Sequence, residues 1–437
     1  VRPHVTPLVE TILRDTTGDN TPELARLHAA RAFQQLAAAL ATSEEDESEC
    51  EQMWTKALQS QLLRLMGTSP TLASVVCDCL ATMSPTAYQQ LPNKLQISCM
   101  SSLLCCARDD EPAVRAAAVQ ALASFLTFPT LSQDEQFMND GCDVICQLLK
   151  DPVPLVCGKA AWALGNLTDM LLKTQHVEEI VTPIQLIKTS MEAAQGKVKV
   201  RANAVRALGN LLGLLKERHL SRPEYKDVPL RASELLVKNA SATNSMKVSW
   251  NACYALGSLL KNEAIHEASS SWQDVVLPAL CHLLVRSYNF KVRTNACVAL
   301  ACVPARRYYG THYIPAWQAV VDGLESVDIM MDFKEVKHKD GLIEQLCMTL
   351  CHLTLVVEFT DLSALYEVGI YHLDTLRRYM TSFYKTSVPQ CAETVLRVAE
   401  GLDPLKKEPL SDLQLEAVNM LLDVFKNNEH KYSDSLF

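Results

Sequence analysis

Residues 114–125, VRAAAVQALASF, decide the fold because the same twelve-residue pattern returns four more times. The later copies are VCGKAAWALGNL (156–167), VRANAVRALGNL (200–211), VSWNACYALGSL (248–259) and VRTNACVALACV (292–303). Their starts lie 42, 44, 48 and 44 residues apart. A near-constant period of a few tens of residues is the signature of a repeat protein. We therefore expect one stacked array rather than unrelated globular domains.

Each copy has the pattern of one amphipathic helix. Counted from its first Val, the residues four, seven, eight and eleven later are small or apolar, and they fall on one face at about 100° per residue. A second apolar stretch precedes each copy across a polar or proline-containing turn, so the repeating unit is an antiparallel pair of helices, A and B. Such a pair buries its faces only by stacking on its neighbours. The predicted fold is all-α, a right-handed α-solenoid of about nine antiparallel helix pairs.

The array is expected to span 1–437 as a single domain. Clear repeats cover 94–303, weaker repeats cover 1–93 and 304–402, and a C-terminal capping helix is expected at 410–427. Because the chain begins at Val1 rather than Met, we expect it to be a piece of a longer protein.

An acidic insert is expected at 43–51, where six of nine residues are Asp or Glu. A block of like charges repels itself and is typical of a solvated, flexible segment. Ser43 and Ser48 each have an acidic residue three positions later, which makes them candidate phosphorylation sites.

Composition excludes several classes of function. A net charge of −9 argues against a dedicated nucleic-acid binder, which normally carries a basic excess. The motifs G-x-S-x-G and H-E-x-x-H and the glycine-rich phosphate-binding loops do not occur. We therefore expect no enzymatic activity, no cofactor, no metal site and no membrane contact.

The sixteen cysteines include no C-x-x-C pair, and most stand at apolar helix positions. We interpret them as reduced core thiols, which indicates a cytoplasmic or nuclear protein.

The pattern Val-Arg-x-x-Ala-x-x-Ala-Leu-Gly-x-Leu after an Asp-rich turn resembles the HEAT/armadillo superfamily. Val-Arg dipeptides stand at 114–115, 200–201 and 292–293, and Asp110 and Asp151 match the Asp of the turn. The resemblance implies an Asp–Arg ladder between repeats, weakened where Cys157 and Ser249 replace the Arg. The chain as a whole is also similar to the C-terminal part of the HEAT repeat-containing protein 6 family.

One copy is more similar to an armadillo repeat. Trp162 and Asn166 match the Trp-x-x-x-Asn element of karyopherin-alpha proteins, whose Asn holds the backbone of an extended peptide and whose Trp walls pockets for Lys stems. The equivalent slots of the next two copies hold Arg206 with Asn210 and Tyr254 with Ser258, so only one copy keeps both residues.

A polar stripe runs beside the core face of the B helices and is expected to line the concave groove. It holds Asn203, Asn251 and Asn295 in three successive copies. An amide has donors and an acceptor, so the Asn column either binds an extended backbone or bonds neighbouring B helices to one another. Trp162 and Tyr254 are either groove anchors or core residues.

A basic cluster opens one of the B helices, with Lys197, Lys199, Arg201 and Arg206. Cations at a helix N-terminus oppose the helix dipole, so compensation is expected. It comes either from the nearby Glu192 or from an acidic segment of a partner.

A second expectation concerns Arg306 to Tyr313, which mixes basic and aromatic residues and is either an interface or a cover for the stack.

The sequence favours a scaffold or adaptor that binds a peptide or helical segment of another protein in the groove. Karyopherin-like cargo recognition, which requires basic cargo, and a structural arm of a larger multi-repeat protein are the alternatives. The partner-binding candidates are Trp162, Asn166, Asn203, Arg206, Asn210, Asn251, Tyr254 and Asn295.

Overall fold

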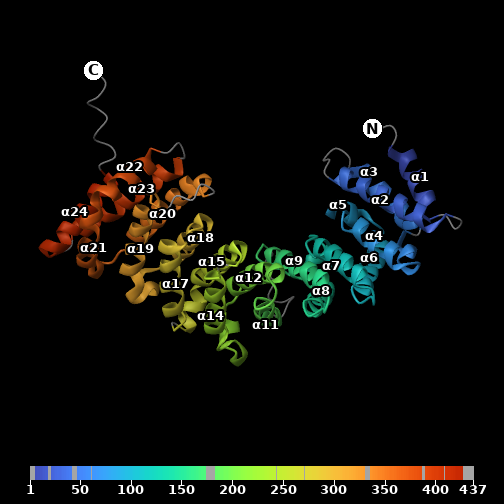
Figure 1. The fold of residues 1–437 in the computed structure, drawn as a ribbon, viewed down its shortest axis with the longest axis horizontal. Coiled ribbons are helices and arrows are strands. Elements are labelled where there is room, and N and C mark those ends of the chain that lie inside the picture. Colours follow the sequence, from blue (N-terminus) through green and yellow to red (C-terminus); the bar gives the residue numbers. More distant parts are fainter. Residues whose placement is uncertain are drawn as a thin grey trace, which may run out of the picture. The chain divides into compact units, whose positions relative to one another are not determined.

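The computed structural model describes residues 5–17, 21–41, 47–60, 62–173, 183–242, 244–269, 271–329, 335–385, 389–407 and 409–426. All regular secondary structure within these ranges is helical. The predicted all-α fold is therefore confirmed. Figure 1 shows the order of the helices along the chain.

The chain divides into two compact units, Val1–Ala207 and Leu208–Phe437. The helices of the first unit are α1 (Val5–Thr17), α2 (Glu23–Ala41), α3 (Glu47–Gln59), η3 (Leu62–Gly67), α4 (Pro70–Leu80), α5 (Pro85–Gln90), α6 (Asn93–Cys106), α7 (Pro112–Phe125), η4 (Leu131–Gln133), α8 (Glu135–Leu148), α9 (Pro154–Leu171) and α11 (Pro183–Ala193). Helix α12 (Val198–Gly213) begins in the first unit and ends in the second.

The first half of the second unit contains α13 (Glu217–Leu220), η5 (Pro223–Tyr225), α14 (Val228–Ala240), α15 (Met246–Lys261), α16 (Glu263–Ala268), α17 (Gln273–Arg286), α18 (Phe290–Leu300), η6 (Arg306–His312) and α19 (Tyr313–Ser326). Its second half contains η7 (Val336–His338), α20 (Lys339–Leu355), η8 (Phe359–Asp361), α21 (Leu362–Gly369), η9 (Ile370–His372), α22 (Leu373–Tyr384), α23 (Pro389–Leu402), η10 (Asp403–Lys407) and α24 (Asp412–Lys426).

The five twelve-residue copies form the B helices α7, α9, α12, α15 and α18, and each follows its predicted A helix. Local signals set where these helices begin. Pro112 and Pro154 occupy first-turn positions of α7 and α9, where a missing N–H costs nothing. Asn289 caps α18 by accepting a hydrogen bond from the Val292 N–H at 3.1 Å.

Consecutive B helices pack directly on one another, α4 on α7, α7 on α9, and α15 on α18. The repeat alanines of the five B helices are all fully buried: Ala118, Ala160, Ala204, Ala252 and Ala296. Small side chains let the helices approach closely, as the periodicity predicted. Two backbones come close at Gly209 of α12, where an added Cβ would lie 2.5 Å from the Ala255 Cα of α15.

Three details of the predicted organisation need correction or comment. Residues 47–51 of the expected acidic insert lie in helix α3, where Cys50 is buried, so they are not a flexible insert; residues 43–46 lie outside the described ranges. The C-terminal helix runs from Asp412 to Lys426 and packs on α21, α22 and α23. Between Arg306 and Tyr313 the three tyrosines are buried, so their rings pack against the helix stack and are not exposed to a partner.

No single helix in the described ranges has both the length and the apolar composition needed to cross a membrane. One sharply bent pair, Val336–Leu355 with Phe359–Tyr384, meets the criteria of length and composition alone.

Candidate protein-interaction surfaces

One face of α9 carries an exposed aromatic ring among polar side chains. Lys159, Trp162, Asn166 and Asp169 recur every three or four residues and therefore share this face. Trp162 is 38% exposed, which places it on the surface rather than in the core. The Lys159 ammonium donates a 2.5 Å hydrogen bond to the side-chain oxygen of Gln120 on α7.

Arg206 reaches from α12 onto α9. Its Nη1 atom lies 3.5 Å from a carboxylate oxygen of Asp169. Its guanidinium lies against Gly165, where a Cβ would be 3.0 Å from the Arg206 Cζ and closer still to Nη2. Only glycine leaves this room in the helix, so Gly165 is what allows the Arg206 side chain to lie across α9.

Two amides accompany Trp162 on this surface. Asn166 and Asn203 are half-buried, and neither side chain forms a hydrogen bond with another described residue. Each therefore keeps donors and an acceptor for a ligand. We call the surface formed by Lys159, Trp162, Asn166, Asn203 and Arg206 the α9–α12 face.

In the second unit the candidate amides are engaged within the protein. Asn210 is fully buried and accepts a hydrogen bond from the hydroxyl of Tyr254 at 3.3 Å. Asn295 donates to the backbone oxygen of Lys291, one turn earlier, at 2.8 Å. These two amides therefore bond neighbouring B helices or their own helix. Tyr254 is 44% exposed, and Asn251 is half-buried.

The phosphorylation candidates receive no structural support. Ser43 lies outside the described residues, and Ser48 lies in the first turn of α3. Modification of either residue remains a prediction.

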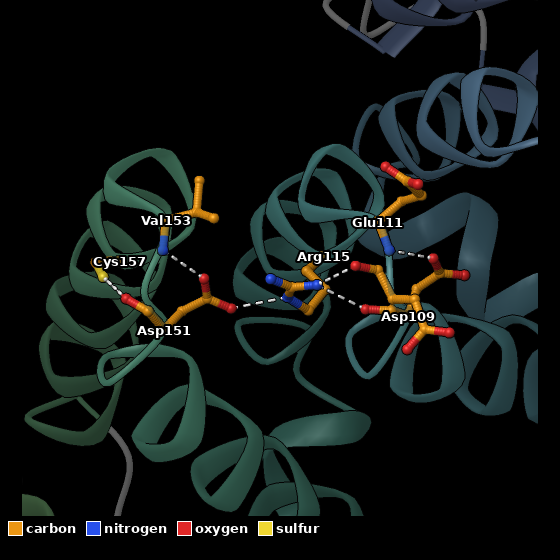
Figure 2. A network of polar contacts seen from close by, with 7 residues as sticks. Asp109, Glu111, Arg115, Asp151, Val153 and Cys157 are labelled. Atoms are coloured by element: carbon orange, nitrogen blue, oxygen red, sulfur yellow. Dashed lines mark hydrogen bonds and ion pairs between the residues drawn. The ribbon is translucent and has the colours of Figure 1, made fainter.

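A polar network joins the A–B turns of two repeats in the first unit. The Arg115 Nε donates to the Asp151 carboxylate at 2.8 Å, and Arg115 Nη1 donates to the carbonyls of Asp109 and Asp110, each at 2.8 Å. Figure 2 shows Arg115 between the two turns. Burial opposes ionisation of Asp151, but hydrogen bonds from Arg115 and the Val153 N–H outweigh it, and the pKa of Asp151 is lowered. The implied Asp–Arg ladder is present here.

Where the repeat lacks Arg, the ladder is shortened. The Cys157 thiol donates to the carbonyl of Asp151 at 2.7 Å, as Figure 2 also shows, and the Ser249 hydroxyl donates to the carbonyl of Ala242 at 2.6 Å. Both side chains bond the turn of their own repeat, and within the described residues neither forms a hydrogen bond to the next repeat. Burial raises the pKa of the Cys157 thiol, so this group is a neutral donor.

Arg293 makes the longer connection in the second unit. It is fully buried, and it donates to the carbonyl of Leu284 on α17 at 2.7 Å and to the carbonyl of Gly323 on α19 at 2.9 Å. Burial lowers the pKa of the Arg293 guanidinium, and these carbonyls supply the partners that a buried cation requires. Arg293 thus links consecutive repeats through backbone carbonyls.

The described residues contain no group of three or more His, Cys, Asp or Glu side chains placed to hold a metal ion. The sixteen cysteines are all free thiols, and most are buried. Burial raises the pKa of Cys79, Cys99 and Cys253 to about 12, as expected of core thiols rather than nucleophiles.

One further feature, a cavity between two A–B turns of the first unit, was not predicted from the sequence. The one related observation in the sequence was the basic cluster that includes Lys197 and Lys199, because both of these residues line the cavity. We call it the turn cavity.

Comparison with known proteins identifies the repeat type. The HEAT repeat family matches residues 99–128, which include most of α6 and all of α7. This segment is similar to a HEAT repeat. The HEAT/armadillo-type repeat fold expected from the pattern is therefore confirmed, whereas the comparisons do not single out the HEAT repeat-containing protein 6 family.

Other similarities are more distant. An uncharacterized protein of Dictyostelium discoideum is 21% identical over 432 aligned residues, which cover 73% of this chain. The match spans 28% of the length of that protein, so the chain corresponds to less than a third of it.

Two solved structures also resemble the chain. An engineered protein is 18% identical with a TM-score of 0.48, covering 96% of this chain and 99% of its own. A designed armadillo repeat protein in complex with the peptide (KR)4 is 19% identical with a TM-score of 0.44, covering 57% of this chain and 99% of its own.

Proposed function

We propose that this chain is a non-enzymatic protein-interaction scaffold that binds a peptide or helical segment of a partner on the α9–α12 face. The observation that carries the proposal is the exposed ring of Trp162 beside an amide, Asn166, that has no partner within the described residues. Aromatic anchors next to unsatisfied polar groups are typical of interface hot spots. The free amides would bond the main chain of the bound segment.

The charge of this face favours one class of partner. Lys159 donates its hydrogen bond to a neutral amide, Gln120, and the part-buried Asp78 carboxylate offsets only part of its positive charge. The nearest carboxylate on the face, Asp169, is already paired with Arg206. A neutral or acidic segment is therefore preferred. Karyopherin-like recognition of basic cargo is the less favoured alternative, because Arg206 occupies the slot where the next tryptophan of such a groove would stand.

The test compares two sets of variants in the full chain. Trp162→Ala, Asn166→Ala and Asn203→Ala are combined in one protein, and Tyr371→Ala, which removes a ring that is 86% exposed on η9, is the matched control. Asn210 is left unchanged because it is fully buried, and its replacement would disturb folding. Partners are identified by quantitative proximity labelling in cells, and circular dichroism checks that both variants are folded.

We expect partners that label with the wild type and Tyr371→Ala to be lost with the triple variant. Retention of every partner by a folded triple variant would refute binding on the α9–α12 face.

The intracellular location remains part of the proposal, supported by the free state of all sixteen thiols. We also propose membership of the HEAT repeat-containing protein 6 family and a role as an arm of a larger protein.

A further inference from the structure

The turn cavity has the size and lining of a ligand pocket. Its volume is about 610 Å³, within the usual range for sites that hold small molecules or peptide side chains. It opens between the α8–α9 turn and the α11–α12 turn, both in the first unit. Its walls include Pro152, Pro154, Cys157, Ala193, Lys197 and Val200. The exposed lining is mostly apolar, and the charged residues Lys150, Asp151, Glu192, Lys197 and Lys199 also line the cavity.

The acidic groups of the cavity are already paired. The Glu192 carboxylate lies 2.9 Å from the Lys150 ammonium, and Asp151 is held by Arg115 at 2.8 Å. The sequence suggested Glu192 as the group that compensates the basic cluster of α12. In the structure Glu192 instead pairs with Lys150, so compensation of the basic cluster by Glu192 is wrong.

Two positive charges at the cavity therefore lack a counter-ion. Lys197 and Lys199 are exposed, and neither forms an ion pair with another described residue. They stand at the first turn of α12, where the helix dipole adds further positive potential. An apolar concavity with uncompensated cations at one side is complementary to an apolar group that carries anions beside it.

We infer that the turn cavity binds an acidic peptide segment of a partner protein, with one large apolar side chain in the cavity and flanking carboxylates on Lys197 and Lys199. Two lysines are too few for a nucleic-acid track, and the net charge of −9 opposes one. The site lies at the turns and not on the α9–α12 face, so it goes beyond the proposed function and is tested separately from it.

The thiol of Cys157 contributes shape rather than chemistry. It is half-buried in the wall, and its proton is committed to the Asp151 carbonyl at 2.7 Å. Since burial raises its pKa, it stays neutral beside Lys197 and leaves the positive charge of the cavity intact.

The experiment measures fluorescence anisotropy of two labelled probe peptides with the full chain. Both read Gly-Asp-Glu-X-Glu-Asp-Gly, with X as Leu in one and Trp in the other, and a third peptide has Ala at X. The test protein carries Lys197→Glu and Lys199→Glu. The control carries Lys94→Glu and Lys173→Glu, which change the net charge equally at exposed positions of the same unit.

We expect the better of the two probes to lose about tenfold in affinity with the Lys197→Glu, Lys199→Glu protein and less than about twofold with the control. The Ala peptide should bind about tenfold more weakly than the Leu or Trp peptide, because it leaves the apolar cavity unfilled. Hydrogen exchange should slow at 149–154 and 193–200 when the probe is bound.

Three outcomes overturn the inference: no binding of either probe at millimolar protein, equal losses in the test and control proteins, or exchange protection elsewhere. The Trp162→Ala variant should bind the probes as the wild type does. Retained probe binding by that variant, with loss of its cellular partners, would separate this site from the proposed function.

Discussion

The contact at Gly209 gives the sharpest test of how the repeats stack. A Cβ on this residue would lie 2.5 Å from the Ala255 Cα and 2.6 Å from its Cβ. Non-bonded carbons are most stable at about 3.5–4.0 Å. The substitution Gly209→Ala therefore requires α12 and α15 to separate locally by about 1 Å.

Two opposing effects set the size of the change. Overpacking a core contact costs about 1–3 kcal/mol, and the upper part of that range applies here because a backbone atom cannot rotate aside. Alanine also favours the helix over glycine by about 1 kcal/mol. The net expectation for Gly209→Ala is a loss of about 1–2 kcal/mol in the free energy of unfolding.

Two other helical glycines provide a graded control. At Gly158 of α9 an added Cβ meets nothing within 4 Å, so Gly158→Ala should stabilise the chain by about 0.5–1 kcal/mol. At Gly257 the nearest atom is the Ala299 Cα at 3.3 Å, so the two effects should nearly cancel. The expected order of stability is Gly158→Ala, then Gly257→Ala, then Gly209→Ala.

The assay is urea unfolding followed by circular dichroism, with hydrogen exchange of α12 and α15 as a local measure. The local measure is needed because repeat proteins open in parts. If Gly209→Ala raises the unfolding midpoint as Gly158→Ala does, the close approach of the two helices is wrong.

Three further predictions concern the turns and the core. Asp151→Asn should lower the free energy of unfolding by about 2–3 kcal/mol at pH 7. Because the folded pKa of Asp151 is lowered, its carboxylate stabilises the fold above about pH 4, and this stabilisation is lost as the pH falls through the folded pKa. The stability of the Asp151→Asn variant in urea titrations should therefore depend less on acidic pH than that of the wild type. An unchanged pH dependence would contradict this prediction. Burial lowers the pKa of His266, so the unfolded state takes up the proton first and the free energy of unfolding should fall as the pH drops below about 6.5. Urea unfolding of the wild type and of His266→Gln at pH 7.5 and 5.5 tests this prediction, because the variant should show a smaller difference between the two pH values. Ala252→Leu should lower the free energy of unfolding by about 1–3 kcal/mol through overpacking. An unchanged unfolding midpoint would mean that Ala252 does not lie in a tight contact between helices.

The B helices could be predicted from the sequence because their apolar period and their alanines act within one repeat. The sequence left Trp162 open as a groove anchor or a core residue, and its exposure was decided by the structure. The helical start of α3 could not be predicted from charge alone. Burial of residues such as Cys50 and Trp54 stabilises a helix whose first turn, by composition, resembles a solvated insert.

The fate of the candidate amides depended on neighbours in other repeats. Asn210 and Asn166 occupy the same slot, yet the Tyr254 hydroxyl reaches Asn210 and Asn210 is buried, whereas Asn166 is left without a partner. The partner of Glu192 was decided in the same way, because stacking brings Lys150 next to it. The turn cavity also arises from the spacing of two turns, which no single repeat encodes.

The residue after the repeat Val has a consequence for how the chain carries mechanical load. Arg115 and Arg293 each fasten two successive repeats, whereas Cys157 and Ser249 fasten only the turn of their own repeat. A pull along the array would be resisted by buried polar links at Arg115 and Arg293, whereas at the Cys157 turn the polar link to the next repeat is the exposed Lys150–Glu192 ion pair, which is weaker. Compliance would therefore vary from joint to joint, and a single substitution between Arg and a short side chain would tune the stiffness of one joint while leaving its helices intact.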